Sequence, residues 1–82
     1  MASRQDLIEG VDHAIAGRWD DAHKAAQSNA DDRDYCWLHA ILHKIEGDEA
    51  NARYWYRRSG HAFEAYPDAN AELAAIRAAL TY

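Results

Sequence analysis

The sequence predicts an all-α fold made of two stacked, antiparallel helical hairpins and a C-terminal capping helix. Three observations support this prediction. A pattern of residues recurs after 30 positions, apolar residues recur at the spacing of helices, and no segment alternates polar and apolar residues as a strand does.

The repeat is centred on two glycine turns. Residues 17–22 read GRWDDA and residues 47–52 read GDEANA, and the residues around them also correspond. The corresponding pairs are Ile8/Leu38, Gly10/Ala40, Val11/Ile41, His13/His43, Ile15/Ile45, Ala22/Ala52 and Asn29/Ser59. A period of this size indicates one helical hairpin used twice, since a single hairpin buries its apolar face only by packing on a neighbour.

The first hairpin is expected over residues 3–29. Ser3 is a favoured N-cap residue, and an apolar stripe that stops before Gly17 predicts a helix over residues 4–16. This stripe consists of Leu7, Ile8, Val11 and Ile15. Two aspartates after the turn favour the start of a second helix, because carboxylates are stabilised at helix N-termini. Alanines give this second helix a narrow inner face up to about Asn29.

The second hairpin is expected over residues 33–60. Apolar residues at helical spacing fill its first helix and stop at Gly47, a residue typical of a helix C-terminus. Asp48 is suited to start the next helix. In that helix, Trp55 and Tyr56 are predicted to turn inward.

The remaining residues predict a capping helix. Gly60 is expected to end or kink the fourth helix, and residues 61–66 form either its continuation or a short extra turn. Pro67 favours a break before it and is favoured at a helix start, so we expect the capping helix over residues 67–81. Its apolar stripe consists of Leu73, Ile76 and Leu80.

The second hairpin resembles a tetratricopeptide repeat. In that family a glycine ends the first helix, and an alanine, an aromatic residue and a small residue follow at fixed spacing. The matching residues are Gly47, Ala52, Tyr56 and Ser59. The first hairpin matches less closely because Ala26 stands at the aromatic position, and the period is 30 residues where the family has about 34. The resemblance covers residues 6–60 and implies stacked antiparallel hairpins.

Size and composition limit the classes of function. The 82 residues form one small domain, and the single cysteine, Cys36, excludes an internal disulfide. A formal charge of −5, from 9 basic and 14 acidic residues, argues against nucleic-acid binding. No apolar stretch opens the chain, so we expect a cytoplasmic protein without a membrane span. Because so small a core is marginally stable, a homodimer is an open alternative.

Three side chains of metal-binding type share one face of the third helix. Cys36, His39 and His43 stand at positions i, i+3 and i+7. Thiolate and imidazole are zinc ligands, and His13, the repeat equivalent of His43, could supply a fourth. The closely paired ligands of structural zinc sites are missing. Two interpretations remain: a small-ligand or metal-binding site, or imidazoles that pack on the preceding hairpin and are hydrogen-bonded.

The run RYWYRR at residues 53–58 mixes basic and aromatic side chains. Helical geometry predicts an outward face formed by Tyr54, Arg57, Arg58 and His61. Such a face suits an acidic peptide, a carboxylate terminus or a second subunit. A solvated face paired with nearby carboxylates is the alternative. These four residues, together with His39 and His43, are the candidates for partner binding.

The sequence contains no signature of catalysis. It has no glycine-rich phosphate loop, no activated-serine motif and no HExxH motif. We therefore expect a non-enzymatic scaffold that binds a protein or peptide, without catalytic residues and without a cofactor. Trp19 and Trp37 are expected to fill space between the hairpins.

Overall fold

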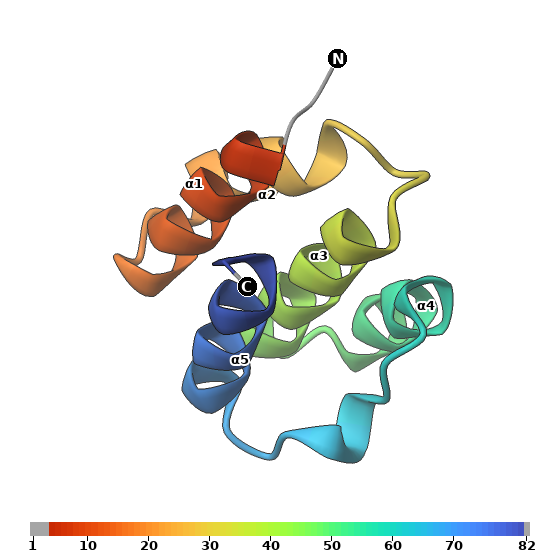
Figure 1. Cartoon of the computed structure of the whole chain (residues 1–82). Helices are drawn as coiled ribbons and strands as arrows, with labels where there is room; N and C mark the ends of the chain where they lie inside the picture. Colours follow the sequence, from red (N-terminus) through yellow and green to blue (C-terminus); the bar gives the residue numbers. More distant parts are fainter. Residues whose placement is uncertain (1–3, 82) are drawn as a thin grey trace.

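The computed structural model describes residues 4–81, and it is helical throughout its regular elements (Figure 1). The elements are α1 (Arg4–Ile15), α2 (Trp19–Gln27), α3 (Arg33–Glu46), α4 (Glu49–Ser59), the 3₁₀ helix η1 (Phe63–Ala65) and α5 (Ala69–Thr81). No strand occurs among the described residues, so the all-α class is confirmed. The expected N-cap residue Ser3 lies outside the described residues.

Short glycine turns join α1 to α2 and α3 to α4. Gly17 and Gly47 both have a φ of 82°, a left-handed conformation that glycine adopts without a steric penalty. After the second turn, the Asp48 carboxylate accepts a hydrogen bond from the backbone N–H of Asn51 and caps α4. As the sequence predicted, α1 packs against α2, and α3 packs against α4.

The central helix is α3, which contacts α1, α2, α4 and α5 (Figure 1). Its buried residues form one unbroken run: Tyr35, Cys36, Trp37, Leu38, His39, Ala40, Ile41 and Leu42. Because these residues cover nearly all sides of α3, the helix is enclosed by its neighbours. Consequently, α3 carries the polar side chain of His39 into the protein interior.

Small residues bring α2 close to the rest of the fold. Its buried residues are Ala22 and Ala26. On the α1 side, a Cβ atom added to Gly10 would lie 2.6 Å from the Cβ of Ala25. The helix ends at Gln27, two residues before the predicted end. Helices with such small side chains at their contact approach each other closely, so polar side chains beside the alanines also come near α3.

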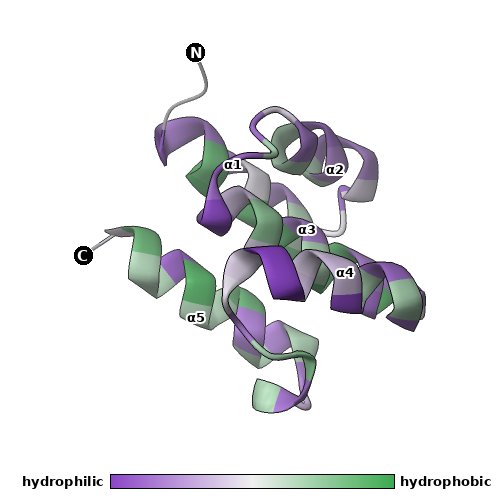
Figure 2. Cartoon of the chain, turned by 90° about the vertical axis from the view of Figure 1, so that its right-hand side faces the viewer, coloured by the Kyte–Doolittle hydropathy of each residue, from purple (hydrophilic) through white to green (hydrophobic). Residues whose placement is uncertain are grey.

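The last helix, α5, packs across α1 and α3 (Figure 1). The predicted apolar stripe of Leu73, Ile76 and Leu80 is buried. In Figure 2, α5 is coloured mostly as hydrophobic, whereas α4 carries long hydrophilic stretches. On the side facing α1, the Arg77 guanidinium pairs with the Asp12 carboxylate, with Nε and Oδ1 2.6 Å apart. The capping helix therefore contacts both predicted hairpins, through α1 and α3.

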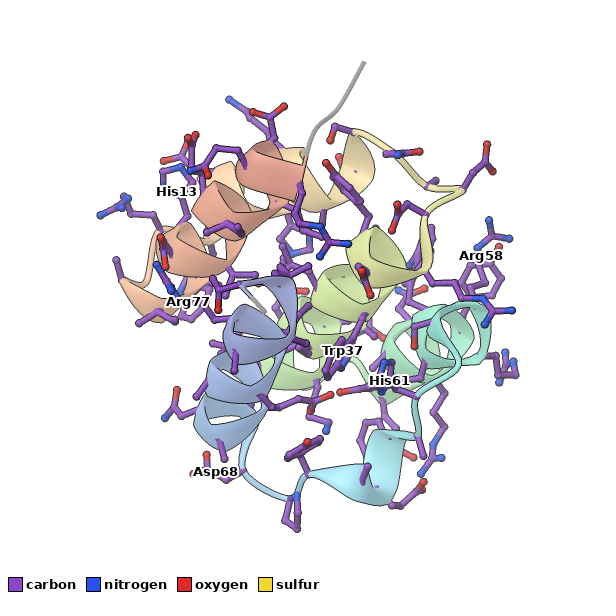
Figure 3. The ribbon with its side chains drawn as sticks, in the orientation of Figure 1. His13, Trp37, Arg58, His61, Asp68 and Arg77 are labelled. Atoms are coloured by element: carbon purple, nitrogen blue, oxygen red, sulfur yellow. The ribbon has the colours of Figure 1, made fainter. Side chains whose placement is uncertain are left out.

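The expected start of this helix at Pro67 is corrected by the structure. The first residue of α5 is Ala69, and Pro67 lies before it. The cause is Asp68, whose carboxylate accepts a hydrogen bond from the backbone N–H of Asn70 at 3.0 Å (Figure 3). Before it, Gly60 ends α4 with a φ of 81°. Of the two alternatives for residues 61–66, the short extra turn is right, because η1 forms there.

Two predictions about apolar side chains were wrong, and two were right. Trp37 is buried as expected, but Trp19 is 40 % exposed and fills no space between the hairpins. Ile15, placed on the apolar stripe of the first helix, is 53 % exposed. Both residues flank the turn between α1 and α2, at the outer end of the first hairpin. Trp55 turns inward as predicted and packs against the edge of the core, where it is half-buried.

All five α-helices that the structure describes pack against other helices of the domain. None of the helices in residues 4–81 combines the length and the apolar character needed to cross a lipid bilayer.

Candidate metal centre

Three histidine side chains from two helices converge between α2 and α3. His39 and His43 are one helical turn apart and therefore share a face of α3. His23 reaches this face from α2. One potential ligand atom from each histidine lies within 4.8 Å of the corresponding atoms of the other two.

The three rings pack directly on one another. The rings of His39 and His43 are stacked, with centroids 4.8 Å apart. The ring of His23 meets both of them edge-on, at centroid distances of 5.5 Å to His39 and 5.3 Å to His43. The histidines thus form a single cluster, which we call the histidine triad.

A carboxylate lies beside the histidine triad, outside the group of ligand atoms that come within 4.8 Å of one another. Glu46 Oε2 lies 3.0 Å from His23 Nε2, and Glu46 Oε1 lies 3.0 Å from His43 Nδ1. The second pair does not have hydrogen-bond geometry, so the buried Nδ1 atom of His43 has no hydrogen-bond partner in the part of the chain that the structure describes. A buried ring nitrogen without such a partner is a free donor atom for a ligand.

The environment of His39 keeps its imidazole neutral. The side chain is 6 % exposed. Burial lowers the pKa of His39 from 6.5 to about 4; repulsion from His43 and His23 adds to this shift, and Glu46 opposes it. A neutral imidazole is the form that binds metal ions, so at pH 7 no proton has to leave this ligand.

Trp55 of α4 forms one wall of the site. Its indole stacks on the His39 ring with centroids 4.2 Å apart and an angle of 23° between the planes. The guanidinium carbon of Arg58 lies 5.6 Å from the indole on which it rests. The stacked indole excludes water from one side of His39 and places a fluorescent group next to the histidine triad.

The donor atoms suit zinc. Zinc binds imidazole nitrogen at about 2.0–2.1 Å in tetrahedral geometry, which places ligand nitrogens about 3.3 Å from one another. The triad atoms lie within 4.8 Å of one another, so side-chain rotation has to bring them closer. His23 and His43 have room to rotate because they are 18 % and 16 % exposed. Three imidazoles and one carboxylate form a set of ligands typical of zinc.

The ligand set expected from the sequence is corrected at two positions. Cys36 is buried, but its thiol donates a hydrogen bond to the carbonyl oxygen of Ala30 at 3.2 Å and does not belong to the cluster. Its position three residues before His39 rotates it toward the loop that precedes α3. His13 also lies apart, at the outer side of α1 (Figure 3), where its Nδ1 accepts a hydrogen bond from Arg18.

Sequence reasoning missed His23 and Glu46. His23 corresponds to Arg53 in the repeat, so the internal symmetry gave no reason to select it. The available signal was its place directly after Ala22, on the edge of the alanine face that packs near α3. Glu46 stands three residues after His43 and so lies on the same side of α3.

The predicted outward face is divided by the structure. Tyr54 is 45 % exposed, and Arg57 is exposed and forms no hydrogen bond or ion pair with residues 4–81. Arg58 donates a hydrogen bond to the carbonyl oxygen of Ala30 at 3.1 Å. His61 stacks on Trp37 at 3.7 Å, and Arg58 points away from this pair (Figure 3). The four residues therefore do not form one continuous surface.

Comparison with known proteins gives no match for the chain, whether with protein-family models, curated proteins or solved structures.

Proposed function

We propose that this protein binds a divalent transition-metal ion, with zinc as the best match, through His23, His39, His43 and Glu46. One observation carries the proposal: three imidazoles from two helices bring their ligand atoms within 4.8 Å of one another in a partly buried site. Imidazole clusters of this kind are costly to protonate and are stabilised by a cation that all three can share.

The role of the ion follows from the helices that it joins. His23 belongs to α2, whereas the other ligands belong to α3, so a bound ion cross-links the first hairpin to the second. A small domain without disulfides gains stability from such a link, because metal binding adds to the free energy of unfolding. At a free zinc concentration of 100 times Kd the expected gain is about 2.7 kcal/mol.

Equilibrium dialysis of tag-free, metal-stripped protein against zinc tests the proposal. We expect one zinc ion per chain. His23→Ala and His43→Ala are each expected to weaken binding at least about tenfold, the loss typical of disrupted ligation. His13→Ala is the matched control, because it also removes a histidine but leaves the histidine triad intact. Equal zinc binding by all four proteins would contradict the proposal.

A second candidate function is recognition of an acidic protein or peptide. Its support is Arg57, which is exposed and has no polar partner in the described part of the chain. Arg57 lines a surface pocket of about 180 Å³ together with Arg53, His61 and Glu64, and the Glu64 carboxylate pairs with Arg53 rather than with Arg57. A guanidinium with free N–H groups binds carboxylates in a bidentate manner, so an acidic side chain or a C-terminal carboxylate fits this pocket.

A fluorescent glutamate-rich peptide tests this second function. We expect Arg57→Ala to lower the affinity for the peptide severalfold. Lys24→Ala removes one positive charge from α2 and serves as the control for non-specific attraction. Equal losses in both variants would show that only net charge matters and would contradict a site at Arg57.

The other predictions from the sequence concern activity, location and oligomeric state, and they remain proposals. We infer a non-enzymatic protein in the cytoplasm, with stacked hairpins of tetratricopeptide type and with the homodimer as an alternative to the monomer. Sedimentation equilibrium of the metal-stripped and the zinc-loaded chain decides between the two oligomeric states.

A further inference from the structure

The helix that supplies His23 is the shortest α-helix among residues 4–81 and buries no large side chain. α2 has nine residues, and its buried residues are Ala22 and Ala26. Helices shorter than about 12–15 residues are marginal on their own and depend on tertiary packing. Two alanine methyl groups bury less apolar surface than the large side chains that α3, α4 and α5 place in the core.

The ends of α2 are also weakly stabilised. Arg18 occupies its N-cap position without a side-chain hydrogen bond to the helix. Ser28 at the C-cap has a right-handed conformation, so the helix lacks the left-handed glycine that ends α3 and α4. By contrast, Asp48 caps α4 through its side chain, and Tyr56 buries a large ring from it. Missing caps lower helix stability.

The neighbouring helix α1 does not share this weakness. It buries Leu7 and Val11 in the core. The ion pair between Asp12 and Arg77 joins it to α5. Opening of α2 therefore leaves α1 attached to the rest of the domain.

His23 links the side chains of α2 to those of α3 through polar and ring contacts. His23 Nε2 lies 3.0 Å from the Glu46 carboxylate, and its ring contacts those of His39 and His43. A metal ion shared by these residues would replace a few weak contacts by coordination bonds across the same boundary. Any opening that separates α2 from α3 would then have to break the metal site.

We propose that metal occupancy determines whether α2 is docked on α3, so that this helix is a metal-responsive switch. The inference rests on the metal-binding function proposed above. In the metal-free chain α2 opens transiently and more often, and each opening exposes the face of α3 that carries His39 and His43. In the loaded chain α2 is closed over that face. The ion that binds is a divalent ion of the zinc type, and its binding reduces the exposure of this face of α3.

Amide hydrogen exchange of the full chain, followed by NMR, tests the switch. In the metal-free protein we expect the hydrogen-bonded amides of residues 23–27 to exchange faster than those in the middle of α3. If opening of α2 releases the ion, free zinc at 100 times Kd lowers the opening equilibrium about 100-fold. The same residues should then exchange about 100-fold more slowly.

Two variants separate the switch from simple stabilisation. His23→Gln is expected to abolish the slowing in residues 23–27, because the ion no longer contacts α2. His13→Gln removes a histidine of α1 that lies outside the histidine triad, so zinc is expected to slow exchange in residues 23–27 of this variant by the same factor as in the unmodified chain.

Three results would overturn the inference. If zinc binds in dialysis but residues 23–27 exchange at an unchanged rate, the switch is wrong while the metal-binding function stands. The same holds if these amides are as protected as α3 in the metal-free protein. If dialysis shows no zinc binding, the function and the switch both fail.

Discussion

Glu72 of α5 accepts a hydrogen bond from the indole Nε1 of Trp37 at 2.8 Å, although the side chain of Glu72 is fully buried. The carboxylate also accepts hydrogen bonds from Lys44 Nζ and from the Tyr56 hydroxyl, each at 2.7 Å. Burial, together with the nearby carboxylate, raises the pKa of Tyr56. This network joins α3, α4 and α5 and fixes the helix that carries His39.

Replacement of Glu72 is expected to destabilise the fold strongly. Glu72→Gln removes the counter-charge of Lys44, whose side chain is 10 % exposed. Removal of one partner of a buried ion pair costs about 3–5 kcal/mol, and we expect the lower part of this range because Lys44 retains some contact with water. Urea unfolding measures the effect. The double variant with Lys44→Met should recover part of the loss, and a Glu72→Gln protein as stable as the unmodified chain would contradict the account.

Two glycine substitutions should reduce stability for different reasons. Gly47→Ala meets no atom within 4 Å, but the φ of 82° is unfavourable for alanine. The expected cost is about 1 kcal/mol. Gly10→Ala has no such backbone strain, but its Cβ would lie 2.6 Å from the Ala25 Cβ. Thermal unfolding should therefore show a loss in both variants.

Zinc affinity distinguishes the two variants further. Gly10→Ala pushes α2 away from α1 and should lower the affinity for zinc, whereas Gly47→Ala should leave it unchanged. Equal zinc affinity in both variants would show that the position of α2 does not matter for the site.

The metal-free protein should lose stability in mild acid. The pKa of His39 is about 4 in the fold and 6.5 without its neighbours, so below pH 6.5 the unfolded chain binds more protons. The contribution of His39 is therefore complete above pH 6.5 and is lost as pH falls from 6.5 to 4. Circular dichroism melts across this range measure the effect. His39→Gln should flatten the dependence, and a dependence as steep as that of the unmodified chain would exclude His39 as its cause.

Arg57 and Arg58, two neighbouring arginines of α4, should differ in their contribution to stability. Arg57→Ala is expected to leave the melting temperature unchanged, because Arg57 has no polar partner in residues 4–81. Arg58→Ala should lower it, since Arg58 donates a hydrogen bond to Ala30 and covers the Trp55 ring. Differential scanning fluorimetry of the two variants checks this contrast. Identical melting temperatures would mean that the Arg58 contacts do not stabilise the fold.

Local signals in the sequence were enough to predict most of the helices. Glycines at 17, 47 and 60 end helices because their left-handed conformation is a local property, and Asp48 caps α4 for a similarly local reason. Helical spacing likewise identified the buried stripe of α5. Its start was placed too early because both Pro67 and Asp68 favour a helix start, and Asp68 provides the cap.

The candidate site was only half predictable, because it depends on contacts between helices. His39 and His43 were found from their spacing on a single helix. His23 reaches the site from another helix, 16 residues away from His39 in the sequence. Outside the site, Glu72 likewise contacts Trp37 across 35 residues. A repeat pattern describes what the hairpins share, so it could not show a side chain that only one hairpin uses.

X-ray absorption spectroscopy of the tag-free protein loaded with one equivalent of zinc tests the central claim most directly. The account predicts nitrogen and oxygen neighbours at about 2.0–2.1 Å with the scattering pattern of several imidazoles, and no sulfur neighbour. The Cys36→Ser variant should give the same spectrum. A sulfur neighbour at about 2.3 Å, or zinc surrounded only by water, would contradict a metal centre built from His23, His39, His43 and Glu46.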